Sequence, residues 1–143
     1  MTAATLAERL GGKKTLSRDI HSDLELADAV RSGLPYRSVE YVIETGTLSA
    51  REVYALVGSR RSLTRKKLED RALSPVESDR LARVVWVVGR TEAVLGDREA
   101  ARRWLRKSNC ALGGRRPLEL LASDVGTRIV EHALGRIEHG VYS

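Results

Sequence analysis

The residues of this 143-residue chain best suited to chemistry form a run of cations and hydroxyls near its middle. Arg and Lys side chains reach phosphates and the edges of guanine, and small hydroxyl residues contact DNA without blocking approach to a groove. This run therefore predicts nucleic-acid binding rather than catalysis. The candidate DNA-contacting residues are Arg60, Arg61, Ser62, Thr64, Arg65, Lys66 and Lys67.

The charge of the whole chain favours the same kind of partner. The formal net charge of +6 and the pI near 9.9 are typical of proteins that bind an anionic partner. Residues 51–73 carry seven Lys and Arg against three acidic residues, and residues 97–107 carry five against two. The positive charge is thus concentrated in two segments, of which the first contains the candidate run. A solvated basic helix that binds nothing is the alternative interpretation.

The surrounding residues predict a helix-turn-helix. A capping box at residues 49–52 starts a short helix, and Gly58 ends it with the positive φ that glycine tolerates. The basic run then forms a second helix, anchored by Leu63 and Leu68. Ser59 stands after the turn glycine, where such motifs commonly have an apolar residue. Two short helices joined by a tight turn are the layout of a DNA-binding helix-turn-helix.

The rest of the chain also reads as helices. Aromatic residues make up only 4% of the sequence and Phe is absent, so the core must be built from Leu, Val, Ile and Ala. Ser74, Pro75 and Glu77 give the clearest helix start, and a long helix follows. Strand is the alternative for residues 84–88, but the chain has no second strand to pair with it. We predict an all-α fold of about eight helices.

Four segments follow from this pattern. We expect a flexible N-terminal arm over residues 1–22, a helix-turn-helix domain over 23–73, a long connecting helix over 74–96 and a small helical domain over 97–143. A single helix-turn-helix offers few phosphate contacts, so we expect a homodimer that reads two half-sites. The long helix, apolar on more than one face, is the candidate for part of the dimer surface.

Several motifs in the C-terminal third agree in order with one known family. These motifs are Ala101-Arg102-Arg103-Trp104-Leu105, Asn109, Leu112 to Leu121, Gly126, Val130, Leu134, Ile137 and Gly140. With them, this third resembles the toxin-binding domain of the Xre/MbcA/ParS antitoxin family. Residues 73–81 are similar to the linker of that family, so that the resemblance covers about residues 34–143.

The resemblance implies a function as well as a fold. It implies an Xre-like helix-turn-helix followed by a toxin-binding domain, in an antitoxin of a type II toxin–antitoxin system. The implied partners are operator DNA, bound to autoregulate the operon, and a RES-type toxin that consumes NAD and whose active site the antitoxin covers. The alternatives are that Gly113 and Gly114 only turn the chain, and that the protein is a solitary regulator whose C-terminal domain only dimerises. The implied toxin-binding residues are Gly113, Gly114, Arg115, Arg116, Pro117, Glu138, Gly140, Val141 and Tyr142.

We expect no enzyme, cofactor or metal site. The single cysteine, Cys110, has no identifiable base near it in sequence, and it excludes an intramolecular disulfide. His132 and His139 lie seven residues apart and read as surface histidines rather than metal ligands. No stretch approaches the roughly 18 apolar residues of a membrane span, and the N-terminus lacks the apolar centre of a signal peptide, so we expect a cytoplasmic protein.

Overall fold

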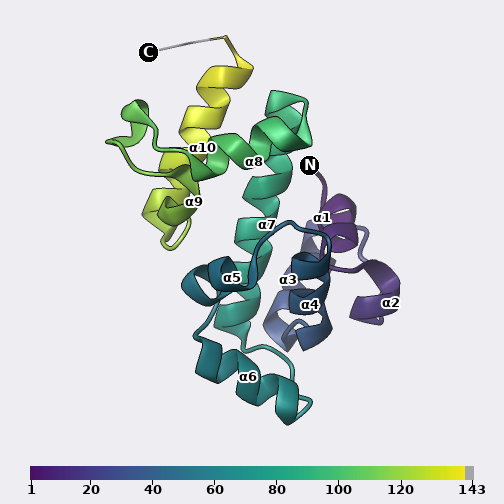
Figure 1. Ribbon diagram of the computed structural model, residues 1–143. Helices are drawn as coiled ribbons and strands as arrows, with labels where there is room; N and C mark the ends of the chain where they lie inside the picture. The colour runs from purple at the N-terminus through teal and green to yellow at the C-terminus, as the bar shows by residue number, and fades with distance from the viewer. Residues whose placement is uncertain (141–143) are drawn as a thin grey trace. The chain divides into compact units, whose positions relative to one another are not determined.

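The computed structural model describes residues 1–140, and the chain divides into two compact units (Figure 1). The first unit ends at Val85 and the second comprises the described residues from Trp86 onward. Ten α-helices and one 3₁₀ helix lie within residues 1–140, with no strand among them, which confirms the all-α prediction. All eight predicted helices are present, and the two additional ones lie at the N-terminus.

Helices α1 to α6 belong to the first unit, together with the first part of α7. Its core consists of aliphatic side chains, among them Leu34, Val39, Val42, Leu48 and Val53, as the scarcity of aromatic residues requires. The helices are α1 (Ala3–Arg9), α2 (Gly12–Leu16), α3 (Asp23–Ser32), α4 (Tyr36–Glu44), α5 (Ala50–Leu56), α6 (Arg60–Leu68) and α7 (Pro75–Leu95).

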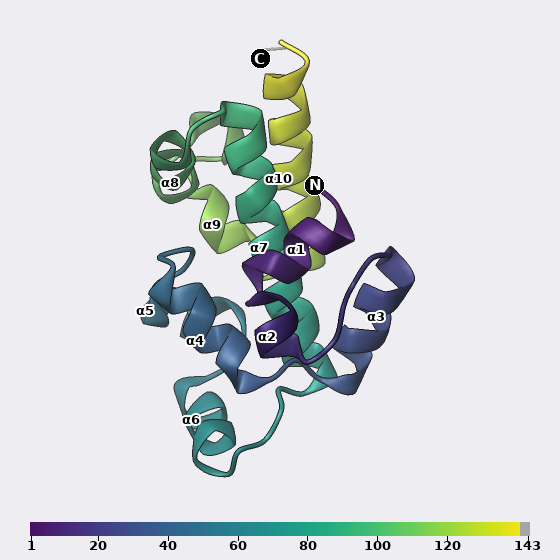
Figure 2. The same cartoon turned by 90° about the vertical axis from the view of Figure 1, so that its right-hand side faces the viewer.

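The N-terminal segment differs from the predicted flexible arm. It forms α1 and α2, which lie side by side in Figure 2, and the side chains of Leu6, Leu10, Leu16 and Ile20 are buried. The sequence pattern misled because Gly11 and Gly12 suggested an irregular segment. Gly11, at φ +116°, instead turns the chain between two short helices.

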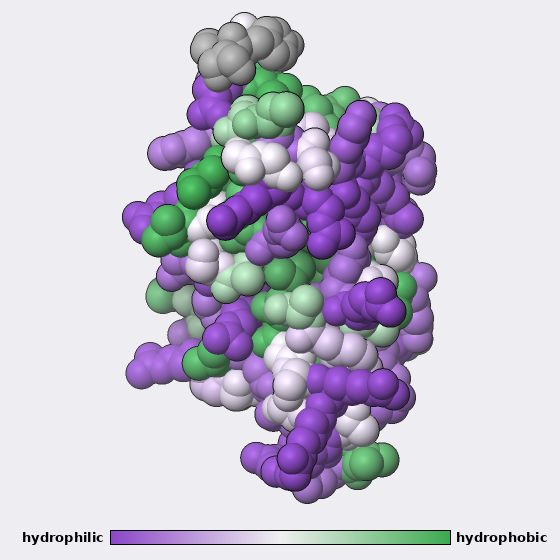
Figure 3. Space-filling view, turned by 60° about the vertical axis from the view of Figure 1, so that its left-hand side comes forward, coloured by the Kyte–Doolittle hydropathy of each residue, from purple (hydrophilic) through white to green (hydrophobic). Residues whose placement is uncertain are grey.

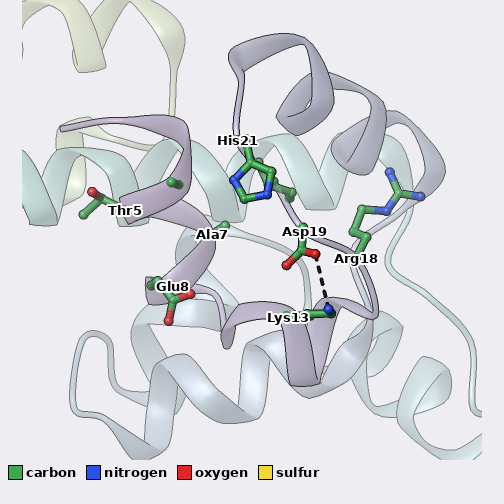
Figure 4. A pocket seen from close by; sticks show the side chains of 9 residues that line it. Thr5, Ala7, Glu8, Lys13, Arg18, Asp19 and His21 are labelled. Carbon is green, nitrogen blue, oxygen red and sulfur yellow. Dashed lines mark ion pairs between the residues drawn. The ribbon is translucent and has the colours of Figure 1, made fainter.

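A small hollow beside α1 and α2 is lined by charges of both signs (Figure 4). The Lys13 ammonium lies 3.3 Å from the Asp19 carboxylate, and Glu8 and Arg18 also line the hollow. Because each sign of charge has its opposite nearby, the hollow has no net preference for an anion or a cation.

Ser78 connects α7 to the turn before α4. Its side chain is fully buried, and its hydroxyl oxygen accepts a hydrogen bond from the backbone N–H of Leu34 at 2.8 Å. The carbonyl oxygen of Leu34 in turn accepts the N–H of Leu73 at 2.9 Å. The two bonds therefore join residue 34 to residues 78 and 73 in the first unit.

Replacing Ser78 with alanine should lower the free energy of unfolding by about 1–3 kcal/mol, because the buried N–H of Leu34 loses its acceptor. Equilibrium urea denaturation measures the change. Ser32, which is exposed at the end of α3, provides the matched control, and Ser32→Ala should stay within about 0.5 kcal/mol of wild type. Overlapping curves for Ser78→Ala and wild type would contradict the assignment.

Helix α7 resolves the choice between helix and strand at residues 84–88. The segment is helical, and Val84, Val85, Val87 and Val88 are all buried within the single chain. These four side chains are therefore not available to a second subunit, so any part of a dimer surface on α7 must be formed by its other residues. The two-sided apolar pattern arises because the chain itself covers both sides of this helix.

The second unit contains the rest of α7 and four further elements. Its core is again aliphatic and includes Leu105, Leu121, Val130 and Leu134. Ile129 of the last helix lies outside this core and is 43% exposed. The elements are α8 (Arg98–Arg106), the 3₁₀ helix η1 (Cys110–Leu112), α9 (Pro117–Leu120) and α10 (Asp124–Glu138).

The start of α10 depends on a glycine. Ser123 is the N-cap, and its hydroxyl oxygen accepts the backbone N–H of Gly126 at 3.0 Å. A Cβ atom added to Gly126 would collide with the carbonyl oxygen of Leu120. The close approach of two backbone segments, rather than an unusual φ, therefore requires glycine at this position.

Candidate nucleic-acid interface and partner-binding unit

Helices α5 and α6 form the predicted pair, joined by residues 57–59. In the capping box of α5, the Ser49 hydroxyl accepts the N–H of Glu52 at 3.1 Å and the Glu52 carboxylate accepts the N–H of Ser49 at 2.9 Å. Ser59 is the N-cap of α6, and its hydroxyl accepts the N–H of Ser62 at 3.1 Å. This cap explains why a polar residue follows the turn glycine.

Gly58 leaves space beside a side chain of α7 and does not adopt the backbone angles that favour glycine. Its φ is not positive, contrary to the prediction, and a Cβ atom there would lie 2.8 Å from an oxygen of the Glu77 carboxylate. The turn between the two helices therefore passes directly beside this carboxylate.

Helix α6 has a single buried apolar residue. Leu63 is fully buried, whereas Leu68 is 81% exposed, so the expected anchoring by both leucines was wrong. Five residues along a helix amount to a rotation of about 140°, so the two side chains cannot share one face. Leu63 alone holds α6 by hydrophobic contact.

Four of the seven predicted DNA-contacting residues form one exposed face of α6, which we call the reading face: Arg60, Arg61, Thr64 and Arg65. Among the described residues, the three arginine side chains form no ion pair or hydrogen bond within the chain. Hydrophilic side chains dominate the lower end of the view in Figure 3, the end at which Figure 1 places α6. Unpaired guanidinium groups at helical spacing are suited to binding phosphates and guanine edges.

The other three predicted residues bind within the chain. The Lys67 ammonium lies 3.5 Å from the Glu40 carboxylate of α4 and 6.0 Å from the centroid of the Tyr36 ring. Ser62 and Lys66 both bind Glu77. These three side chains therefore have partners within the chain, unlike the reading face, and their contact with DNA stays a prediction.

Glu77 is the centre of a cluster that sequence reasoning recognised only as a helix cap. One carboxylate oxygen accepts the backbone N–H of Ser74 at 2.9 Å and lies 2.9 Å from the Lys66 ammonium. The other oxygen accepts the Ser62 hydroxyl at 2.9 Å, and Lys66 also donates to the Ser62 hydroxyl at 3.1 Å. We call these four residues the Glu77 clamp. Ser62 and Lys66 lie 15 and 11 residues before Glu77 in sequence, and no local signal reveals their contact with it.

The groups around the Glu77 carboxyl favour its ionised form. Burial raises the pKa of Glu77, but the N–H of Ser74, the Lys66 ammonium and the Ser62 hydroxyl outweigh burial, so the pKa lies below its ordinary value. A carboxyl whose pKa falls on folding stabilises the native state at neutral pH. That stabilisation is lost as the pH falls through the acidic range.

In the second unit, the loop with two glycines is closed by Asn109. The N–H of Asn109 donates to the carbonyl of Arg115 at 3.1 Å, and the N–H of Gly114 donates to the carbonyl of Asn109 at 2.9 Å. Gly113 and Gly114 have φ values of +69° and +79°, and a Cβ atom on either would meet nothing within 4 Å. Backbone conformation, rather than lack of space, favours glycine at both positions.

The implied toxin-binding residues are not all surface groups. Gly113, Gly114, Arg115 and Arg116 are exposed, but Pro117 is buried at the first turn of α9, where its ring fits a helix start. Pro117 therefore supports the loop and presents no contact surface, contrary to its expected role.

The two arginines of this loop differ in their pairing. Arg116 forms an ion pair with Glu119 at 3.3 Å. The Arg115 side chain has no ion pair among the described residues.

The implied C-terminal contacts lie at the end of α10. Glu138 forms an ion pair with Arg90 of α7 at 3.4 Å and none with the loop arginines within the described part of the chain. Gly140 is exposed at φ +71°. Val141 and Tyr142 lie outside the described residues.

Residues 1–140 lack the features of two other kinds of protein. None of the helices is both long enough and apolar enough to cross a membrane. Within the same residues, no three His, Cys, Asp or Glu side chains gather where they would hold a metal ion.

The fold and the reading face together define a two-part helix-turn-helix protein, with the motif in the first unit and a separate helical unit after it. Residues 25–85 match the antitoxin Xre-like helix-turn-helix domain, and residues 90–140 match the antitoxin Xre/MbcA/ParS C-terminal toxin-binding domain.

Curated relatives carry the same assignment. The chain is 32% identical over 120 residues to Antitoxin Xre of Yersinia enterocolitica, covering 82% of this chain and 81% of the relative. It is 30% identical over 122 residues to Antitoxin Xre of Pseudomonas putida, covering 85% and 76%. A third, Antitoxin Xre of Photorhabdus laumondii, is 28% identical over 116 residues, covering 80% and 78%. The chain belongs to the Xre/MbcA/ParS antitoxin family. This family consists of antitoxins and not of enzymes, as predicted.

Proposed function

We propose that this protein neutralises a cognate RES-type, NAD-consuming toxin by covering its active site, and binds operator DNA to autoregulate the operon that encodes both. Both activities would take place in the cytoplasm. The observation that carries this proposal is the order of two matched domains in one chain, a helix-turn-helix domain followed by a toxin-binding domain. In the segments predicted from the sequence, residues 23–73 would bind DNA, 74–96 connect and 97–143 bind the toxin.

The DNA-binding half is supported by the state of the α6 side chains. Arg60, Arg61 and Arg65 are exposed and unpaired among the described residues, while the other basic side chains of this helix are neutralised by Glu77 and Glu40. Charges that the fold does not use are those available to an external polyanion. A homodimer would place two such faces on two half-sites, through a surface other than the buried valines of α7.

The toxin-binding half is supported by the loop of residues 113–116. The two bonds to Asn109 fix the loop, so little conformational entropy is lost when it meets a partner. Its glycines let another backbone approach closely, and Arg115 remains unpaired for an acidic or carbonyl acceptor.

Replacing Arg115 and Arg116 with alanine should weaken toxin binding by about tenfold or more, because arginines at the centre of an interface contribute strongly to affinity. The full-length protein is co-expressed with the tagged product of the adjacent reading frame, and recovery of the complex and rescue of growth are measured. NAD consumption by the purified toxin, with and without this protein, tests the toxin's proposed chemistry.

The control is Arg18→Ala with Arg31→Ala, which removes two exposed cations from the first unit. Equal recovery of the complex with both double variants would exclude a role of the loop in toxin binding. A second variant, lacking residues 138–143, tests the C-terminal tail separately by the same growth assay. If no toxin co-purifies with the wild-type protein, the solitary-regulator interpretation is favoured instead.

A further inference from the structure

The reading face of α6 depends on the rotation of that helix about its axis. Leu63 is its single buried residue, and one apolar contact restrains rotation only weakly. A further restraint must therefore decide which side chains of α6 point outward.

The Glu77 clamp supplies that restraint. Ser62 and Lys66 are one helical turn apart, and both bind the carboxylate of Glu77. Glu77 is buried, with only 7% of its surface exposed. Two contacts four residues apart fix both the rotation and the tilt of α6. Arg61 and Arg65 each precede a clamped residue by one position, so the clamp sets the direction in which they project.

The surrounding structure holds Glu77 in place. Its backbone N–H donates to the Ser74 hydroxyl at 3.1 Å, its carboxylate caps the first turn of α7, and Gly58 leaves room for it. The carboxylate is thus fixed to α7 independently of α6, as a positioning group must be.

We propose that Glu77 is a positioning residue for operator recognition, which orients α6 without touching DNA. This inference rests on the proposed DNA binding. It also predicts that removing the Glu77 charge weakens operator recognition, which is opposite to the effect that simple electrostatics predicts. Removing an acid beside a basic helix and freeing Lys66 should strengthen non-specific attraction to DNA. Loss of a positioning group should instead reduce the preference for the operator over other sequences.

The test uses the full-length protein with two duplexes of equal length, one covering the region upstream of its own gene and one with the same bases shuffled. The ratio of the two affinities is measured for wild type and for Glu77→Gln. The glutamine oxygen can still accept the N–H of Ser74, so the start of α7 keeps its cap. We expect the ratio to fall by about five- to one-hundredfold, the effect of losing one base contact, while shuffled-duplex affinity is unchanged or higher.

Asp79→Asn is the matched control, because it removes the same charge from the next turn of α7. Asp79 is exposed and pairs with Arg83 rather than with α6. The control should retain the wild-type ratio. An unchanged ratio for Glu77→Gln would overturn the positioning role of Glu77 but not the proposed operator binding. A wild-type protein with no preference for the upstream duplex would overturn both.

A double variant, Lys66→Gln with Glu77→Gln, keeps the test decisive if the single variant does not fold. Two amides can hydrogen-bond across the same gap and leave no buried charge unpaired. If Glu77 acts by positioning, the double variant recovers most of the wild-type ratio. A ratio that remains lost would overturn the inference.

Discussion

Replacing Arg61 and Arg65 together with alanine should lower the affinity for operator DNA by about a hundredfold or more. Each good phosphate or base contact contributes about 1–3 kcal/mol, and both arginines lie exposed on the reading face with no ion pair in the described part of the chain. The change removes no internal contact of the fold, so toxin binding should be unaffected. Fluorescence anisotropy with the upstream duplex measures the affinity.

The salt dependence of binding distinguishes this effect from a general loss of charge. Each arginine that contacts a phosphate adds about 0.9 to the slope of log affinity against log salt, so the slope should fall by up to about 2. The Arg18→Ala, Arg31→Ala control carries the same net charge and should keep wild-type affinity. An operator affinity retained by the Arg61 and Arg65 variant would place the DNA surface elsewhere on the molecule.

Replacing Gly126 with alanine should lower the free energy of unfolding by about 2–4 kcal/mol. The added Cβ atom overlaps the carbonyl oxygen of Leu120, which belongs to the backbone and cannot turn away as a side chain would. The first turn of α10 must therefore shift, and its bond to Ser123 must lengthen. Equilibrium urea denaturation followed by circular dichroism measures the loss.

Gly135 offers a control in the same helix. It lies in the interior of α10, where an added Cβ atom meets nothing within 4 Å and φ is ordinary. Gly135→Ala should be neutral or stabilising by up to about 1 kcal/mol, because alanine favours helix. If the two alanine variants were equally stable, the close approach at Gly126 would not exist in solution.

The helix starts were predicted well because capping is local. The helix starts at Ser49 and Ser74 each have a carboxylate three residues later, and both reciprocal pairs of capping bonds are formed in the structure. The N-terminus was predicted poorly, because the burial of Leu6 and Leu10 depends on packing partners outside that segment. Gly11 and Gly12 instead indicated an irregular segment.

The candidate site shows the same division. The composition of α6 identified a basic helix in the right place, but residue type does not say which side of a helix faces inward. That choice depends on Glu40 and Glu77, which are distant in sequence. In the second unit the loop was located correctly, and Pro117 was misassigned because a proline that starts a helix and a proline that contacts a partner look identical in a sequence.

Helix α6 separates the residues that hold it from those that face outward. Leu63, Ser62 and Lys66 attach the helix, while the reading face makes no contact that the fold needs. Substitutions at Arg60, Arg61, Thr64 and Arg65 should therefore leave folding largely unchanged. Under the proposed operator binding, the DNA sequence that α6 recognises can therefore change through these four positions without cost to the fold that carries them.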